Sequence, residues 1–204
     1  GARMTELVIR EIGQDEWPLY QSVPIRFRVE SIYRVEPVDD GRGGLALVEE
    51  SVARSYVKDY DGDPDRQERP AHWRERFDVS NWLFLLAFEG SRTVGAAAVA
   101  FRSPGLDMLE GRDDLAVLWD FRVYPDCRRQ GIGSALFHRA AEWAQAQGCT
   151  RLKIETQNVN VAACRFYAAH GCRLTTIDCG AYGNVPHVTH ETMLIWSLDL
   201  PAPM

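Results

Sequence analysis

The chain has 204 residues, of which 46% are hydrophobic and 25% charged, and 23 basic residues against 29 acidic ones give a formal net charge of −6. These values are typical of globular domains and exclude a disordered, collagen-like or small disulfide-scaffold protein. The acidic balance argues against nucleic acid as a partner, since phosphate backbones bind basic surfaces, and it suits a cationic substrate.

The cysteines and the hydropathy pattern predict a cytoplasmic protein. The five cysteines are odd in number and contain no C-x-x-C pair, so neither a disulfide framework nor a structural zinc site is expected. No apolar run approaches the roughly 18 residues of a membrane span, and no secretory signal opens the chain. Gly1–Arg3 precede Met4, and we leave them out of the fold as an expression remnant.

The first sixty residues are expected to be mostly strands. Leu7–Ile12 is a short apolar run typical of a strand, and Gln14–Tyr20 follows as a helical turn or loop around a proline. Alternation over Phe27–Val35, then a run of turn-forming residues, then Leu45–Val48 predicts a hairpin. A helix over Leu45–Tyr60 is the alternative.

The rest of the chain predicts strands that alternate with helices. Lys58–Arg76 is rich in charge and contains two prolines, so we expect a loop followed by a short surface helix. Trp82–Phe88 and Thr93–Phe101 form the clearest hairpin, with strands of interior character. We expect further strands over Leu115–Val123, Leu152–Thr156, Leu174–Ile177 and Met193–Leu198, and helices over Gly133–Gln147 and Val159–His170.

The junction between the strand ending at Val123 and the following long helix has the features of an anion-binding loop. It contains Arg128, Arg129 and the pair Gly131-x-Gly133. Glycines let a backbone approach a ligand closely, and the first N–H groups of a helix have no internal partner, so the junction is suited to a pyrophosphate. The alternative is an ordinary turn whose arginines are solvated.

Two better-known phosphate loops do not fit this junction. A dinucleotide fingerprint requires a small residue at position 136, where the chain has Leu136. A P-loop requires a lysine after its second glycine, and Gly133 is followed by Ser134 and Ala135. The junction therefore fits neither of these two classes of phosphate-binding loop.

Two sequence motifs at a fixed spacing indicate a family that the chain resembles. Arg128–Gly133 matches the pattern R/Q-x-x-G-x-G/A, and the second block matches N-x-x-A-x-x-x-Y-x-x-x-G-F through Asn160, Ala163, Tyr167, Gly171 and, in place of phenylalanine, Cys172. Together they resemble the GNAT superfamily of acyl-CoA-dependent N-acetyltransferases. The resemblance implies one α/β (α+β) domain over 1–204, with a mixed, mostly antiparallel, centrally splayed sheet flanked by helices, and an acetyl-CoA-binding core at about 114–172.

Further residues narrow the resemblance. They are Glu155-Thr156-Gln157, Ala163-Cys164 and Phe166-Tyr167, then Asp178, Tyr182, Asn184 and Ile195-Trp196. In these positions the second half of the chain, from about Leu115, looks like the streptothricin acetyltransferases within the superfamily. The first hundred residues are only weakly similar.

The resemblance assigns cofactor-binding roles to three parts of the chain. Backbone groups of Phe121, Arg122 and Val123 would bind the pantetheine arm of acetyl-CoA, and a backbone N–H near Val123 would polarise the thioester carbonyl. The pyrophosphate would be bound by the loop residues Arg128, Arg129, Gln130, Gly131, Ile132, Gly133 and Ser134. Asn160 would hydrogen-bond the cofactor or the strand backbone, and helix N-capping is its alternative role.

Three residues are candidates for proton transfer. Tyr167 matches the family's general acid, which protonates the departing CoA thiolate, and its alternative role is that of a core aromatic. An attacking amine must be neutral, so a carboxylate is expected near the acetyl group, and Asp120 and Glu155 lie in apolar strands. The alternative for each carboxylate is an ion pair, with Arg122 or Arg173 for instance.

The acceptor is the least specified part of the prediction. Trp119, Asp120, Glu155, Tyr182 and Asn184 are expected to line its site, with ordinary turn chemistry as the alternative for the last two. The expected acceptor is a small primary amine such as streptothricin or another polycation. A protein N-terminus, a lysine side chain or a metabolite amine remains open, as does a non-catalytic acyl-CoA sensor. Dimers are frequent in the superfamily, which leaves a homodimer open.

The remaining polar clusters predict no metal. The acidic run Asp59, Asp61, Asp63, Asp65 and Glu68 lacks the glycine and acidic spacing of a calcium loop, so we interpret it as a solvated loop that could attract a polycationic acceptor. The five histidines form no H-E-x-x-H or triad-like group and are expected to be structural or incidental.

Overall fold

The computed structural model describes residues 6–62, 69–128 and 131–202. The chain forms two compact units. Unit 1 comprises Gly1–Arg26, Asp59–Lys153 and Asp199–Met204, and unit 2 comprises Phe27–Lys58 and Ile154–Leu198. The boundary at Lys153 falls within the strand Arg151–Gln157 (β7), so this strand contributes to both units.

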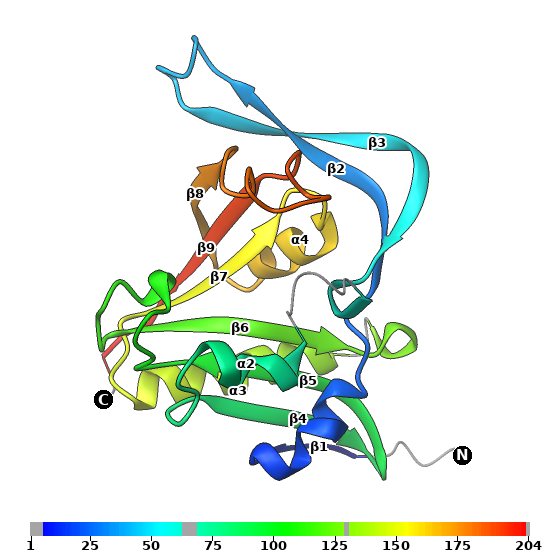
Figure 1. The fold of residues 1–204 in the computed structure, drawn as a ribbon, viewed down its shortest axis with the longest axis vertical. Helices are drawn as coiled ribbons and strands as arrows, with labels where there is room; N and C mark the ends of the chain where they lie inside the picture. The colour runs from blue at the N-terminus through cyan, green and yellow to red at the C-terminus, as the bar shows by residue number, and fades with distance from the viewer. Residues whose placement is uncertain (1–5, 63–68, 129–130, 203–204) are drawn as a thin grey trace. The chain divides into compact units, whose positions relative to one another are not determined.

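Unit 1 is an antiparallel sheet covered by helices. Its elements are β1 (Leu7–Glu11), α1 (Trp17–Gln21), α2 (Pro70–Arg76), β4 (Leu83–Glu89), β5 (Arg92–Ala100), β6 (Leu115–Val123) and α3 (Ile132–Ala146). Short 3-10 turns lie at Gln14–Glu16, Tyr60–Gly62, Asp107–Leu109 and Pro125–Cys127. In Figure 1, α2 lies in front of β4–β6 and α3 behind them.

Unit 2 contains a long hairpin and a smaller helix–strand segment. Its elements are β2 (Phe27–Pro37), β3 (Leu45–Lys58), α4 (Val161–Ala169), β8 (Arg173–Asp178) and β9 (Met193–Asp199). The two hairpin strands form a sheet of their own. The hairpin is tied to the segment after β7, because the Tyr33 backbone N–H donates to the Asn158 carbonyl (2.9 Å) and the Asn158 amide donates back to the Tyr33 carbonyl (2.9 Å).

The larger sheet has the hydrogen-bonded strand order β1-β4-β5-β6-β7-β9-β8. β1 with β4, β4 with β5, β5 with β6, and β8 with β9 pair in antiparallel fashion. β6 and β7 are parallel, and their register joins Leu115–Val117 to Arg151–Lys153, which is the first third of the nine-residue β6. The expected mixed, mostly antiparallel sheet flanked by helices is confirmed.

The two faces of β5 explain how the helices of unit 1 are held. Ala96, Ala98 and Ala100 belong to the buried cluster that contains Trp17 and Tyr20 of α1 and Trp73 of α2. Gly95 points to the other face, where an added Cβ would lie 2.7 Å from Leu136 Cδ1 of α3. Small residues on β5 therefore let helices approach both faces of the sheet closely.

Most expected elements are present, and one alternative was wrong. β3 is a strand along Leu45–Lys58, so the alternative of a helix there is wrong. The hairpin turn uses positive φ at Asp39, Asp40, Gly41 and Gly44, which suits Asn, Asp and Gly. The expected short surface helix is α2: Arg74, Glu75 and Arg76 are exposed, while Trp73 is 2% exposed and packs in the core.

Candidate active site

The start of α3 has backbone features that suit an anion. Gly131 is the N-cap of this 15-residue helix, at φ +82°, and it supplies no side-chain cap. A Cβ there would meet nothing within 4 Å, but the left-handed backbone favours glycine. The first N–H groups of α3 and the positive end of its dipole therefore remain suited to an anion.

Of the three loop residues before Gly131 that have predicted roles, the structure describes one. Arg129 and Gln130 lie outside the described residues. Arg128 donates through Nε to the Val123 carbonyl (3.2 Å) and through Nη2 to the Arg26 carbonyl (2.8 Å). Burial, followed by the nearby Arg26 charge, lowers the pKa of Arg128. The guanidinium thus holds the loop to its own unit and is not simply solvated.

A bulge in β6 places two candidate residues on the same face of the sheet. The register joins Val99 to Leu118 and Ala98 to Asp120, so Trp119 is an extra residue in β6. The insertion reverses the alternation of side chains. As a result Trp119 packs against the buried cluster on the α1–α2 side, and Asp120 contacts Tyr20 of α1 on that same side.

Asp120 is engaged in a buried polar quartet, which we define as Tyr20, Asp61, Asp120 and Arg122. Arg122 donates to both oxygens of Asp120 (2.8 and 2.9 Å), and the Tyr20 hydroxyl donates to Asp120 Oδ2 (2.6 Å). Arg122 also donates to Asp61 (2.8 Å) and to the Val23 carbonyl (2.9 Å).

Electrostatic interactions within the quartet keep the Tyr20 hydroxyl protonated and the Arg122 guanidinium charged. Burial and the charge of Asp120 raise the pKa of Tyr20 far above that of a free phenol, so its hydroxyl stays a donor. Burial alone would lower the pKa of Arg122, but the charge of Asp120 and its hydrogen bonds raise it above its usual value. Asp120 therefore has the ion-pair role that was the alternative to a base, and Asp61 is not in the solvated loop expected for it.

A second carboxylate, in unit 2, has a different environment. Glu155 lies on β7 with an exposed side chain, and its Oε2 accepts from the Tyr182 hydroxyl (3.0 Å). Tyr182 in turn accepts from Gln157 Nε2 (3.0 Å). Burial, followed by the charge of Glu155, raises the pKa of Tyr182 far above its usual range. A neutral phenol thus orients this carboxylate.

The helix α4 carries the other two predicted residues of unit 2. Asn160 is its N-cap, and its Oδ1 accepts from the Ala163 backbone N–H (3.1 Å). The capping role is therefore confirmed, and contact with a cofactor stays a prediction. Tyr167 is 5% exposed and meets Phe166 edge-on at 5.5 Å, so it is buried as well as a candidate acid.

Known proteins identify the family. Residues 47–172 match the family described as "Acetyltransferase (GNAT) family". The chain belongs to this family. The acetyltransferase is 29% identical over 154 residues to streptothricin acetyltransferase A of Bacillus subtilis (strain 168), covering 76% of this chain and 79% of that protein. It is also 35% identical over 89 residues to aminoglycoside N(6')-acetyltransferase type 1 of Klebsiella aerogenes, covering 44% and 57%.

Solved structures show the same fold. A nourseothricin acetyltransferase superposes with a TM-score of 0.73 at 22% identity, covering 96% of this chain and 99% of that one. A proposed streptothricin acetyltransferase from Bacillus anthracis str. Ames, in complex with acetyl coenzyme A, superposes with a TM-score of 0.72 at 22% identity, covering 98% and 100%.

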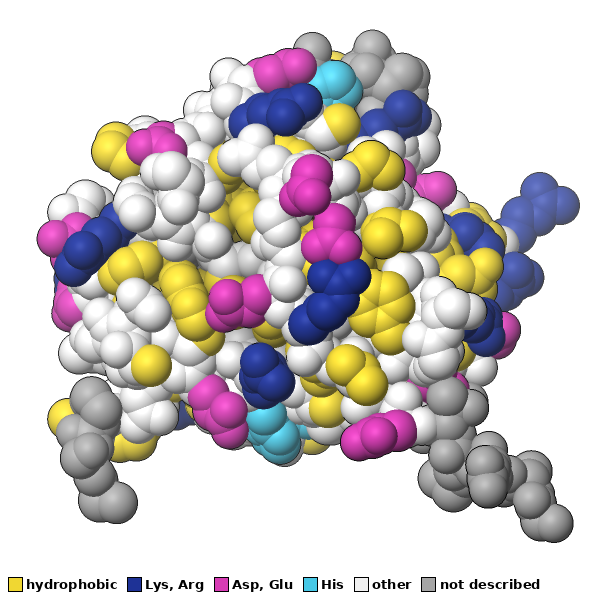
Figure 2. Space-filling view, turned by 90° about the horizontal axis from the view of Figure 1, so that it is seen from below, with side chains coloured by type: hydrophobic (Ala, Val, Ile, Leu, Met, Phe, Trp, Pro, Cys, Tyr) yellow, Lys and Arg dark blue, Asp and Glu magenta, His cyan; other side chains and the backbone are white. Residues whose placement is uncertain are grey.

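The remaining predicted positions of the acetyltransferase are on the surface or outside the described residues. Asn184 is exposed in the turn region after β8. Asp63, Asp65 and Glu68 of the acidic run lie outside the described residues. The charged residues that Figure 2 shows are of both signs and are interspersed with hydrophobic ones. Within the described part of the chain, no cluster of metal-ligating residues and no membrane-spanning helix is found.

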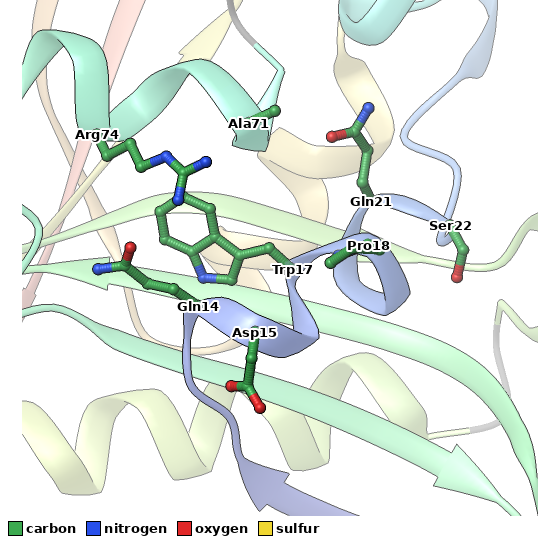
Figure 3. A pocket seen from close by; sticks show the side chains of 8 residues that line it. All are labelled: Gln14, Asp15, Trp17, Pro18, Gln21, Ser22, Ala71 and Arg74. Atoms are coloured by element: carbon green, nitrogen blue, oxygen red, sulfur yellow. The ribbon is translucent and has the colours of Figure 1, made fainter.

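The acetyltransferase has a surface pocket of about 560 Å³. The residues that line it are distant in the sequence from these candidates. Trp17, Pro18 and Gln21 of α1 line it together with Arg74 of α2, and the Arg74 guanidinium lies 5.7 Å from the Trp17 ring (Figure 3). None of the residues predicted for the site lines this pocket.

Sequence reasoning missed three side chains near the candidates. Tyr20 was assigned to a helical turn or loop and Asp61 to a solvated loop. Gln157 was named only among the residues that carry the resemblance to streptothricin acetyltransferases. No periodicity or spacing marks them, because their partners are 100, 61 and 25 residues away in the chain. The one available signal was Arg122, a charge in an apolar strand that needs more than one partner.

Proposed function

We propose that the acetyltransferase transfers an acetyl group from acetyl-CoA directly to a primary amine of a small polycationic antibiotic of the streptothricin class. The observation that carries this proposal is the helix start at Gly131, where an uncapped N-terminus follows a left-handed glycine. The likeness to streptothricin acetyltransferases over three quarters of the chain supports the acceptor class.

The residues present fit the cosubstrate. The orphan N–H groups at the start of α3 would hold its pyrophosphate, with the backbone of Phe121–Val123 along its pantetheine arm. Bound acetyl-CoA would supply an activated thioester. No protein nucleophile is needed, because an uncharged amine attacks a thioester directly.

Glu155 is the base in this proposal, and Asp120 is not. Both oxygens of Asp120 are taken by Arg122, and one also by Tyr20, which leaves it a poor proton acceptor. Glu155 is exposed, and its Oε2 accepts from the Tyr182 hydroxyl. It would remove a proton from the acceptor's ammonium, directly or through water.

Tyr167 is the acid in this proposal. Its phenol would give a proton to the CoA sulfur as the thiol leaves. Its burial at 5% exposure keeps the hydroxyl in a fixed position, which a proton donor requires.

The experiment that tests the acceptor class is a panel assayed by CoA thiol release. Nourseothricin, an aminoglycoside with a free 6'-amine and a peptide with a free N-terminus are compared at equal concentration. We expect the highest kcat/KM with nourseothricin. The aminoglycoside is the second candidate, because a relative with that activity matches 44% of the chain. Preference for the peptide would contradict the proposal, and absence of release with every amine would indicate an acyl-CoA sensor.

A further inference from the structure

Three side chains of unit 2, Gln157, Tyr182 and Glu155, form a hydrogen-bonded series that we call the polar row. Glu155 and Gln157 are two residues apart on β7, so both project from the same face of the strand. The Tyr182 hydroxyl lies between them, because it accepts from Gln157 Nε2 (3.0 Å) and donates to Glu155 Oε2 (3.0 Å). Gln157 and Tyr182 are 9% and 7% exposed, so the polar row leads from a buried amide to an exposed carboxylate.

The chemistry of the three groups fixes the direction of both hydrogen bonds. An ionised carboxylate can only accept, and a phenol has one proton to donate. The Tyr182 proton therefore goes to Glu155, and Gln157 must present its NH₂ group to the phenolic oxygen. If the amide were turned over, its oxygen would face the phenol, and two acceptors would compete for one proton. The amide of Gln157 thus determines which way Tyr182 donates.

The charged neighbours of the polar row keep the Tyr182 hydroxyl protonated. Burial, then the charge of Glu155 and more weakly that of Glu191, raises the pKa of Tyr182 far above its usual range. Glu191, which is 3% exposed, is itself paired with Lys58 of β3. On β7, Lys153 shares the face of Glu155, and its ammonium donates to the Met108 carbonyl (2.7 Å).

The two strands beside β7 contribute little charge near Glu155. In β9 only Asp199 is charged, and it lies by the start of β7, where the Leu200 N–H donates to the Thr150 carbonyl (2.8 Å). The register of β6 with β7 extends no further than Lys153. The Tyr182 hydroxyl is therefore a principal influence of unit 2 on the Glu155 carboxylate.

We propose that Gln157 is a positioning residue for the acetyl transfer: it turns the Tyr182 proton toward Glu155 and so keeps that carboxylate ionised. The proposal rests on the proposed function, in which Glu155 is the base. A hydrogen bond donated to a carboxylate favours its charged form, and only the charged form can take a proton from the acceptor's ammonium. Gln157 acts through the phenol of Tyr182 and not on the substrates.

The test measures kcat/KM for nourseothricin across pH in Gln157→Met and Gln157→Glu, which nearly conserve side-chain length. In Gln157→Met the phenol loses its donor and binds Glu155 less firmly, so kcat/KM should fall at least about twofold below wild type where Glu155 is partly protonated. In Gln157→Glu two carboxylates share one phenolic proton, and the fall should be at least about tenfold. At higher pH both variants should approach wild type, whereas a merely structural loss would lower kcat/KM at every pH.

A second pair of variants separates positioning from packing. In a Tyr182→Phe background, Gln157→Met should not change the pH profile further, because the hydroxyl through which Gln157 acts is absent. Gln145→Met is the matched control, since the Gln145 amide donates to the Pro201 carbonyl (2.8 Å) and not to a phenol, and its profile should equal that of wild type. A wild-type profile in Gln157→Met, or an equal effect of that change with and without the Tyr182 hydroxyl, would overturn the proposal.

The proposal can fail separately from the proposed function. If Glu155→Gln keeps the kcat of wild type, Glu155 is not the base, and the proposed function is wrong on that point. The polar row is then tested without substrates, by a carbon-13 NMR titration of the Glu155 carboxyl. Its midpoint should lie at higher pH in Gln157→Met than in wild type, and higher still in Gln157→Glu, which would show that Gln157 keeps Glu155 ionised. Equal midpoints in the three proteins would overturn the proposal.

Discussion

At the scale of single residues, two carboxylates in neighbouring strands of the sheet have different surroundings. Both oxygens of Asp120 accept hydrogen bonds from Arg122, and one also accepts from the Tyr20 hydroxyl. Glu155 is exposed and accepts from the Tyr182 hydroxyl. The sequence did not separate them, because each is a carboxylate in a strand that also carries basic residues. What separates them is the set of partners: Arg122 is two residues from Asp120, but Tyr20 and Tyr182 come from distant parts of the chain.

Replacing Glu155 tests its role as the base. In Glu155→Gln we expect kcat to fall by about 10²- to 10⁴-fold, the usual contribution of a general base, with binding of acetyl-CoA retained. The residual rate should rise with pH, because only acceptor that is already neutral would react. Tyr182→Phe keeps the carboxylate and should have a smaller effect. An unchanged kcat and pH profile in Glu155→Gln would remove it from the mechanism.

Replacing Asp120 tests its structural role. Asp120→Asn leaves the buried Arg122 with Asp61 as its remaining carboxylate, and we expect the free energy of unfolding in urea to fall by about 3 kcal/mol or more. Asp39→Asn is the matched control, because Asp39 pairs with Arg42 while both side chains are more than half exposed. Its effect should stay below about 1 kcal/mol. Equal losses in the two variants would contradict the buried quartet.

At the scale of elements, the start of α3 is positioned by its packing on β5. Gly95 lies under the first turns of the helix, where an added Cβ would be 2.7 Å from Leu136 Cδ1, 3.2 Å from Ile132 Cγ2 and 3.3 Å from the Arg122 carbonyl. The glycine therefore sets how closely the helix that begins at Gly131 approaches the strand.

A methyl group at Gly95 should push α3 outward. In Gly95→Ala we expect a loss of about 1–3 kcal/mol in unfolding free energy, as for other overpacked sites, together with a raised Kd for acetyl-CoA by calorimetry. Gly180→Ala is the control, because a Cβ there meets its nearest atom at 3.8 Å. If Gly95→Ala binds acetyl-CoA like wild type, the packing of α3 does not govern the site.

Most elements of this fold could be predicted from local pattern, and the exceptions have physical reasons. β6 was predicted with its observed bounds, because a continuous apolar run bounded by a turn identifies a buried strand. The bulge at Trp119 could not be predicted, since it depends on the register with β5. The buried side of α2 was not predicted, because a helix of seven residues offers only one helical interval, from Pro70 to Trp73, between its buried residues.

At the scale of the whole molecule, the predicted candidates fall into both compact units. The start of α3 and Asp120 belong to unit 1, whereas Glu155, Tyr182 and Tyr167 belong to unit 2. The motifs identified the family and the residues that could do chemistry. They did not reveal the quartet, because it depends on tertiary contacts with segments that carry no motif.

The measurement that tests the central claim most directly is the mass of the products after incubation with acetyl-CoA and nourseothricin. A mass readout locates the acetyl group itself, whereas thiol release counts only CoA and carries a fixed background from the exposed Cys179 thiol. The account predicts one acetyl group on nourseothricin for each CoA released, and no acetyl group on the protein. Release of CoA without acetylated nourseothricin, or an acetylated protein that then transfers its acetyl group, would contradict it.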